Sequence, residues 1–551
     1  YADAGCTQPL SGLTLPASRM EGTFYFRGTQ AQALTFTANA AGFASATQGA
    51  NILPAPPRAL VFTTPPQTLQ AGACSDEVEL ELRDAFGNAA NAAGPTVLGL
   101  GPNPAQGLTF YADAGCTQPV TGVNLVTGAR GGGFYVLGTL AGALQLSAAG
   151  NGLTAADLAH TLTPAAARAL AFVTPPWTVG AGTCSGALTV EARDTYGNAS
   201  AVGASTAIDL SGTPATGLTF YTDPGCTTVA TTLTVPQGAS SGSFYFVGTS
   251  AGTFTLTTRS PGLGNVSQAQ TVVAGAPGRL AFTTAPQSVQ AGSCSGAAVL
   301  RTEDANGNPS PNPTAMQINL APSAPNGFAF YADPGCTTPV TQLSVAPGAG
   351  RGTFYFRGTV AQTVTVSAFA SGVAGTSQAE TITAAPASAL AFDSAPQTVT
   401  VGSCSAAATV GLRDGYGNPS PPAQAVAVSL VATPSTGFAL YADPGCTTPL
   451  SQLTLPAGGG ASFYFLGTRA GDVTLGASAA GFGNASQVQT LRPLPPSRLA
   501  FLSAPQTIQA GECSSEAVVQ VQDAYGNPTS VASGAAVGLS ALPSSGFAFY
   551  L

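Results

Sequence analysis

The chain has 551 residues, of which only 7% are charged, and all 16 basic residues are arginines. With a net charge of −8 and no basic patch, it lacks the electrostatic signature of a nucleic-acid-binding protein. The low charge, together with 44% hydrophobic residues, excludes the intrinsically disordered class. No apolar run reaches the roughly 20 residues of a membrane helix, so we expect no membrane insertion by this segment.

Catalytic chemistry is also absent from the composition. One histidine and no lysine leave no way to assemble a Ser/His/Asp set, a metal cluster or a phosphate-binding loop. We therefore expect no enzymatic activity, no catalytic residue, no cofactor and no bound metal.

One passage recurs along the whole chain. The phrase A-G-x-C-S, or V-G-S-C-S in one copy, places cysteines at steps of 110 or 109 residues: Cys74, Cys184, Cys294, Cys404 and Cys513. A unit of this length is a whole small domain, so we expect domains in tandem, as beads on a string. The expected boundaries are the C-terminal part of a domain at 1–56, repeats at 57–165, 166–276, 277–386 and 387–495, and the N-terminal part of a domain at 496–551.

The second repeat illustrates the expected strands in chain order. Short segments with period-two alternation predict strands at 170–172, 187–192, 207–210, 218–221, 233–235, 242–247, 252–257 and 270–273. Pro175-Pro176 and Gly180-Ala-Gly182 interrupt the start of the repeat, which indicates a split edge strand. The pattern predicts an all-β Greek-key sandwich of immunoglobulin type. We expect Leu170, Phe172, Leu188, Val190, Leu210, Phe244, Phe246 and Leu256 to point inward.

The ten cysteines stand twice per repeat, which predicts a disulfide framework and an oxidising compartment. We expect bridges within repeats, namely Cys74–Cys116, Cys184–Cys226, Cys294–Cys336 and Cys404–Cys446. The alternative pairing, Cys116 with Cys184, would join neighbouring repeats across the linker at 164–167. Cys6 and Cys513 then need partners outside the chain and are candidates for an inter-subunit disulfide.

Two aspartate phrases could bind calcium or could simply shape turns. D-x-x-G-N recurs at 84–88, 194–198, 304–308, 414–418 and 523–527, and F-Y-x-D-x-G-C-T contains Asp113, Asp223 and Asp333, with Asp443 in the Leu440 version of the phrase. Each turn offers one carboxylate, whereas calcium takes six or more oxygens, so we expect Asx turns. Calcium that bridges consecutive repeats is the alternative.

Two unusual side chains occupy positions that are polar in the other repeats. His160 aligns with Gln270, Glu380 and Gln489, and we expect this position to be exposed. Trp177 aligns with Gln67, Gln287, Gln397 and Gln506, and we interpret it as a surface substitution.

These phrases resemble those of the bacterial Ig-like domains of invasin and intimin-type surface proteins. The resemblance rests on an apolar first strand, A-G before the second strand, D-x-x-G-N-P after it, and a late A-G-T-x-T-L strand. It covers essentially the whole chain, although the paired cysteines are an added feature and the lectin-like tip domain of such adhesins is absent. The resemblance implies an extracellular stalk or fibre.

We therefore expect a secreted or cell-surface structural protein that forms an elongated fibre, filament or stalk, in which chains bundle laterally. The alternative is the repeat region of an adhesin that contacts a cell-surface receptor. The part-domains at 1–56 and 496–551 allow two interpretations. One is a window cut from a longer repeat array; the other is subunits that complete each other's half-domains, with Cys513 bridging to Cys6 of the neighbour.

Overall fold

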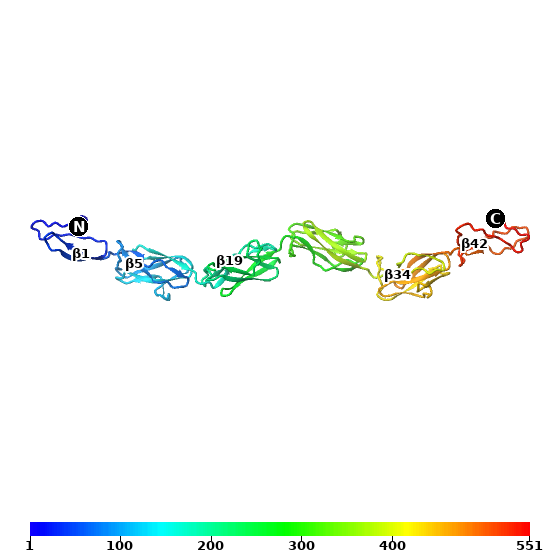
Figure 1. Cartoon of the computed structure of the whole chain (residues 1–551), viewed down its shortest axis with the longest axis horizontal. Helices are drawn as coiled ribbons and strands as arrows, with labels where there is room; N and C mark the ends of the chain where they lie inside the picture. The colour runs from blue at the N-terminus through cyan, green and yellow to red at the C-terminus, as the bar shows by residue number, and fades with distance from the viewer. The chain divides into compact units, whose positions relative to one another are not determined.

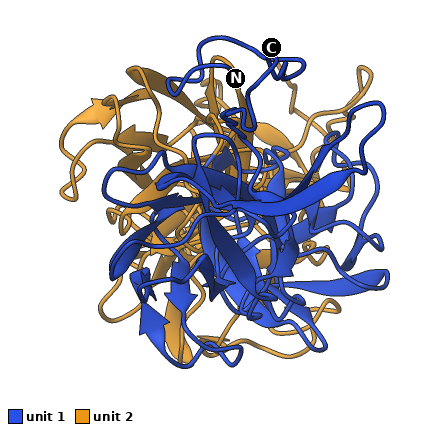
Figure 2. Ribbon diagram, turned by 90° about the vertical axis from the view of Figure 1, so that its left-hand side faces the viewer, with its two compact units in different colours: residues 1–274 blue, residues 275–551 orange.

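The computed structural model describes residues 1–551, and all of its regular elements are β-strands. The chain divides into two compact units, residues 1–274 and residues 275–551 (Figure 2), each of which is described by itself. No element is a helix with the length and apolar character that crossing a membrane requires.

Unit 1 begins with an antiparallel pair, β1 (Gln32–Ala38) and β2 (Ala46–Ile52). The first repeat contains β3 (Pro57–Phe62), β4 (Thr68–Gln70), β5 (Val78–Asp84), β6 (Thr96–Asn103), β7 (Leu108–Tyr111), β8 (Pro119–Val120), β9 (Gly122–Leu125), β10 (Gly131–Gly138), β11 (Gly142–Ala149) and β12 (Ala156–Thr163). The second repeat contains β13 (Ala169–Phe172), β14 (Thr178–Gly180), β15 (Leu188–Arg193), β16 (Thr206–Thr213), β17 (Leu218–Tyr221), β18 (Thr232–Val235), β19 (Ser241–Gly248), β20 (Gly252–Ser260) and β21 (Gly264–Val273) (Figure 1).

Unit 2 is built in the same way. The third repeat contains β22 (Arg279–Phe282), β23 (Ser288–Gln290), β24 (Ala298–Glu303), β25 (Met316–Pro322), β26 (Phe328–Tyr331), β27 (Pro339–Val340), β28 (Gln342–Val345), β29 (Arg351–Gly358), β30 (Gln362–Ala370) and β31 (Val373–Thr383). The fourth repeat contains β32 (Ala389–Phe392), β33 (Thr398–Thr400), β34 (Ala408–Arg413), β35 (Val426–Thr433), β36 (Phe438–Tyr441), β37 (Leu453–Leu455), β38 (Ala461–Gly467), β39 (Gly471–Ser478) and β40 (Ala485–Arg492). The pair β41 (Arg498–Phe501) and β42 (Val519–Gln522) completes the unit.

Each repeat is a sandwich of two sheets, as the second repeat shows. Its first sheet has the order β13-β15-β19-β17, and its second sheet has the order β14-β21-β20-β16-β18. The opening strand is split between them: β13 pairs antiparallel with β15, whereas β14 pairs parallel with β21. The split edge strand is confirmed, and the topology is the expected immunoglobulin-like one. In the third repeat a pairing of Arg279 with Ala374 also joins the two sheets.

The core lies between the two sheets because alternate residues of each strand point inward. In β19, Phe244 and Phe246 are fully buried while Tyr245 and Val247 between them are half-buried. Burying a phenylalanine side chain contributes about 1.5–3 kcal/mol, so these rings are major stabilising groups. Every inward position expected in this repeat is buried except Phe172, which is half-buried and packs against Phe244 with ring centroids 6.3 Å apart.

The expectation that His160 is exposed is wrong. His160 is only 3% exposed because it shares an inward parity on β12 with Leu158 and Leu162. Its Nδ1 accepts a hydrogen bond from the N–H of Gln67, at 3.0 Å, where the split first strand passes from one sheet to the other. The other repeats form the same contact through Gln270 with Trp177, Glu380 with Gln287, and Gln489 with Gln397. A buried acceptor is needed here because the backbone N–H at the crossing would otherwise be unsatisfied.

Candidate functional site

The D-x-x-G-N turn is first of all a local structure. In the second repeat, Asp194 Oδ1 accepts hydrogen bonds from the N–H groups of Tyr196 and Asn198, each at 2.9 Å. Asn198 Nδ2 donates to Asp194 Oδ2 at 2.8 Å. This is the Asx turn expected from the sequence, and Gly197 has φ of 88°, a conformation that favours glycine.

The same turn also holds the linker that enters its own repeat. Asp194 Oδ2 accepts the N–H of Ala165 at 2.9 Å, and Ser200 Oγ donates to the carbonyl oxygen of Ala165 at 2.6 Å. One linker residue is thus bonded through both of its backbone groups. The aspartate contact recurs in every copy, as Asp84 with Ala55, Asp304 with Gly275, Asp414 with Ala385 and Asp523 with Leu494. The hydroxyl contact recurs as Ser310 with Gly275, Ser420 with Ala385 and Thr529 with Leu494.

The asparagine of the turn binds the preceding repeat. Asn198 Nδ2 donates to the carbonyl oxygen of Thr139, and the N–H of Ala141 donates to Asn198 Oδ1, both at 2.8 Å. Thr139 and Ala141 belong to the G-T-x-A loop between β10 and β11 of the first repeat. The same two hydrogen bonds link Asn88 with Thr29 and Ala31, Asn418 with Thr359 and Ala361, and Asn527 with Thr468 and Ala470.

A tyrosine of the turn makes a third contact with the preceding repeat. A Cβ added to Gly72 would lie 2.0 Å from the hydroxyl oxygen of Tyr196, so Tyr196 leaves no space for a side chain there. Gly72 has φ of 80° and is the glycine of the A-G-x-C-S phrase. Tyr416 covers Gly292 and Tyr525 covers Gly402 in the same way. We call the contacts of linker, asparagine and tyrosine together the joint.

In the joint, the aspartate oxygens that calcium would need already accept hydrogen bonds. The carboxylate of Asp84 is 3% exposed and accepts hydrogen bonds from Ala55, Phe86 and Asn88. Burial alone would raise the pKa of Asp84, but these hydrogen bonds outweigh it and lower the pKa to about 2. No group of three or more acidic, histidine or cysteine side chains that could hold a metal is found among residues 1–551. A calcium ion would have to displace N–H donors that already satisfy the carboxylate.

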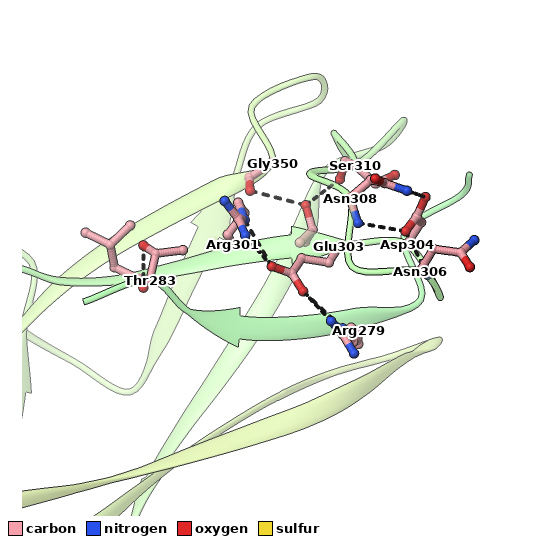
Figure 3. Close-up of polar contacts among 11 residues, drawn as sticks. Arg279, Thr283, Arg301, Glu303, Asp304, Asn306, Asn308, Ser310 and Gly350 are labelled. Atoms are coloured by element: carbon pink, nitrogen blue, oxygen red, sulfur yellow. Dashed lines mark hydrogen bonds and ion pairs between the residues drawn. The ribbon is translucent and has the colours of Figure 1, made fainter. Parts of the chain in front are cut away.

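An arginine adjoins the joint turn in several repeats. Arg83 and Arg413 donate through Nη1 to the carbonyl oxygens of Gly87 and Gly417, at 2.8 and 3.0 Å. The third repeat has Glu303 at this position, and its carboxylate lies between Arg279 and Arg301 beside Asp304 (Figure 3). Burial favours the neutral form of Glu303, but its bonds to the two arginines prevail and lower its pKa.

The arginine contact of the third repeat therefore comes from a different strand. A Cβ added to Gly307, the glycine of the turn, would lie 2.8 Å from Arg279 Nη2. Arg279 belongs to β22, whereas Arg83 is the last but one residue of β5 and Arg413 is the last residue of β34. A guanidinium group thus adjoins the turn in all three repeats.

The cysteines are joined as Cys74–Cys116, Cys184–Cys226, Cys294–Cys336 and Cys404–Cys446, each across 42 positions. Cys6 and Cys513 are free. Asp113 shapes the turn that presents Cys116: its carboxylate accepts hydrogen bonds from the N–H groups of Thr117 and Gln118, and Cys116 has φ of 48°. Equivalent contacts surround Asp3, Asp223, Asp333 and Asp443. Each bridge ties this turn to the segment that precedes the second strand of the first sheet.

Trp177 is 38% exposed, and its indole lies against Gly186, where a Cβ would be 2.2 Å from the ring. Its Nε1 donates to the carbonyl oxygen of Ala187 at 3.3 Å. The glutamines at the aligned position reach the same segment: Gln287 Nε2 donates to Gly296 and Ala297, and equivalent bonds form from Gln397 and Gln506. The tryptophan of the second repeat and the glutamines of the other repeats therefore contact the same backbone segment.

Comparisons with known proteins give little beyond the fold. No family model and no curated protein matches the chain. Among solved structures it is similar to invasin, a bacterial integrin-binding protein, at 13% identity and a TM-score of 0.27 over 81% of both chains. It is also similar to the human desmocollin-1 ectodomain at 10% identity and a TM-score of 0.31, over 82% of this chain and 83% of that one. The S-layer protein rSbsC matches at 13% identity and a TM-score of 0.19, over 86% of this chain and 59% of that one. The immunoglobulin-like assignment rests on the strand order of the repeats themselves.

Proposed function

We propose that this chain is a structural protein of the cell exterior, whose tandem repeats form a surface fibre, filament or stalk. The observation that carries the proposal is the joint. In each copy the aspartate of the turn bonds the linker, and the asparagine bonds the preceding repeat, at Asn88, Asn198, Asn418 and Asn527. A chain of freely swivelling domains has no need of such contacts. Their recurrence supports a role in which consecutive repeats keep a fixed orientation.

The disulfides support an extracellular location. Four bridges stabilise four sandwiches, and disulfides persist in oxidising compartments. We propose no catalytic role, since the polar side chains of the joint are engaged with backbone groups and hold no nucleophile beside a base.

The test measures how freely consecutive repeats move. In negative-stain images of the full chain, we expect a narrow distribution of angles between the first and second repeats and a broader one in Asn198→Ala. Asn265→Ala is the matched control, because Asn265 is exposed and lies outside the joint. Equally broad distributions in the wild type and in Asn198→Ala would remove the basis for a fibre or stalk. Binding of the chain to cells would instead favour an adhesin.

A further inference from the structure

The two faces of each sandwich differ in chemistry. All five ion pairs of the structure involve residues in or beside the first sheet: Arg83–Glu81, Arg193–Glu191, Arg279–Glu303, Arg301–Glu303 and Arg413–Asp393. The outward side of this sheet also carries tyrosines such as Tyr245 on β19. Charge on an exposed sheet keeps proteins apart in solution.

The outward side of the second sheet is almost free of charge. In the second repeat it presents Ser211, Thr213, Thr253, Thr255, Thr257, Ser267, Ala269 and Thr271. We call this surface, with its equivalents in the other repeats, the neutral face. The strand pairing sets these residues side by side, with Thr255 opposite Ala269 and Thr257 opposite Ser267. The hydroxyl groups of Thr257 and Ser267 bond each other at 2.8 Å along the sheet, so one of the two donors is satisfied without water.

The other repeats carry the same kind of face. The third repeat presents Thr363, Thr365, Ser367, Ser377, Ala379 and Thr381, and no outward residue of β25, β28, β30 or β31 is charged. The first repeat presents Gly99, Gly101, Gln145, Ser147, Ala159 and Thr161, and its one charged outward residue is Asp157 on β12. The fourth repeat presents Ser429, Thr433, Thr474, Gly476, Ser486 and Thr490, and its charged outward residues are Asp472 on β39 and Arg492 on β40, one of each sign.

We propose that the neutral face is a self-association surface that packs against the neutral face of a second copy of this chain. Sheets pack face to face about 10 Å apart, and uncharged side chains cost much less to desolvate than charged ones. A second copy fits best because its sites recur at the same interval along the sequence, so that weak contacts add up along the two chains. This inference rests on the proposed structural role and names the partner within it.

Charge on the neutral face of the second repeat also favours a copy of itself. The charged outward residues there are Asp209 on β16 and Arg259 on β20, which are opposite each other in the strand pairing. In a two-fold contact residue i of one copy meets residue j of the other while j meets i, so Asp209 of each copy can meet Arg259 of its partner, and a face with one charge of each sign complements itself.

The test introduces charge on one face or the other. In Thr255→Glu/Thr365→Glu both substitutions fall on the neutral face; in the control, Ser243→Glu/Thr353→Glu, both fall on the outward side of the first sheet. Sedimentation velocity of the full chain at rising concentration should show association of the wild type and the control, and at least tenfold weaker association of the neutral-face variant. Salt at about 1 M should partly restore that association, because it screens the added charges.

A mixing experiment separates a lost contact from a damaged fold. Thr255→Arg/Thr365→Arg alone should also fail to associate, whereas its mixture with the glutamate variant should recover association, since opposite charges then meet. A wild type that stays monomeric, a control that dissociates equally, or a mixture that fails to recover would overturn the proposal. The angle between repeats in isolated chains does not depend on this face, so that measurement tests the proposed function separately.

Discussion

The side chains of Asn198 and Ser200 form hydrogen bonds with backbone groups outside their own turn. Asn198 bonds the preceding repeat, and Ser200 bonds the linker carbonyl of Ala165. Both side chains are buried, at 8% and 3% exposed, and a buried polar group stabilises a fold only when its hydrogen bonds are made. The joint therefore depends on individual atoms, and single substitutions can test it.

Removal of the hydroxyl group in Ser200→Ala should lower the free energy of unfolding of the second repeat by about 1 kcal/mol, because the carbonyl oxygen of Ala165 loses its donor. Trp177 is the single tryptophan and lies in this repeat, so its fluorescence in urea reports on this repeat alone. Ser205→Ala, at an exposed serine of the same repeat, is the control. Equal shifts in both variants would argue against the linker contact.

A substitution at Glu380 is expected to raise the stability of its repeat. Burial raises the pKa of Glu380 above its usual 4.5, so its charged form destabilises the third repeat as the pH rises above that value. Glu380→Gln should therefore stabilise this repeat by about 1 kcal/mol at pH 7, and by less at pH 4. Gln270 and Gln489 show that an amide satisfies the same N–H.

Scanning calorimetry of the full chain at the two pH values measures this effect. The reverse change, Gln489→Glu in the fourth repeat, should destabilise at pH 7 and is the matched comparison. A Glu380→Gln variant that is no more stable than the wild type at pH 7 contradicts the role given to burial.

At the scale of strands and turns, the disulfide holds the Asp223 turn to the segment before β15. Closing a loop across 42 positions restricts the unfolded chain by about 4 kcal/mol in the chain-entropy model. The double variant Cys184→Ser/Cys226→Ser should lower the stability of the second repeat by about that amount, as measured by Trp177 fluorescence.

The same experiment has an internal control in another repeat. Cys404→Ser/Cys446→Ser removes the fourth bridge and should leave the transition of Trp177 unchanged. If the second-repeat variant unfolds at the wild-type urea concentration, the sandwich does not depend on its bridge.

The strands could be predicted because the alternation of apolar and polar residues that marks a strand lies within a short segment of sequence. Period-two alternation located most strands of the second repeat within a few residues. It missed β14, which is only three residues long, and it found only the last four residues of β21, which begins at Gly264. The prediction for His160 was wrong because a polar side chain favours an exposed position, whereas Leu158 and Leu162 on the same strand show that this parity is inward. The turn was predicted as a turn for the same local reason.

The joint could not be predicted in the same way. The partners of Asn198 are the backbone groups of Thr139 and Ala141, and backbone groups leave no mark in a sequence. The available signal was the hydroxyl residue two positions after the asparagine, at Ser200, Ser310, Ser420 and Thr529, which an Asx turn does not require.

At the scale of the whole molecule, the joints should open in acid before the repeats unfold. The pKa of Asp84 is about 2, against an ordinary 3.8, so the stabilisation from its ionised form is complete above pH 3.8 and is lost as the pH falls through about 2. The pKa values of Asp194, Asp304, Asp414 and Asp523 are also lowered. Images of the full chain should therefore show broader angles between repeats at pH 2 than at pH 5.

Circular dichroism at both pH values separates opening of the joints from unfolding of the sandwiches, which their disulfides protect. Asp84→Asn should show the broad distribution between its neighbouring domains already at pH 5 and little further change in acid. Angles that are unchanged at pH 2, or strands that are lost before the angles broaden, would contradict the assignment of the joints to ionised aspartates.

The central claim is that Asn198 bonds the backbone of the preceding repeat, and hydrogen exchange at the N–H of Ala141 tests it most directly. We expect this amide to be protected in the full chain and to exchange at least about ten times faster in Asn198→Ala. A tenfold change corresponds to a loss of about 1.4 kcal/mol in the free energy of opening at this amide. The amide of Val136, which donates to Ser75 within the first repeat, should be unchanged. An Ala141 amide that exchanges equally fast in both proteins would contradict the account.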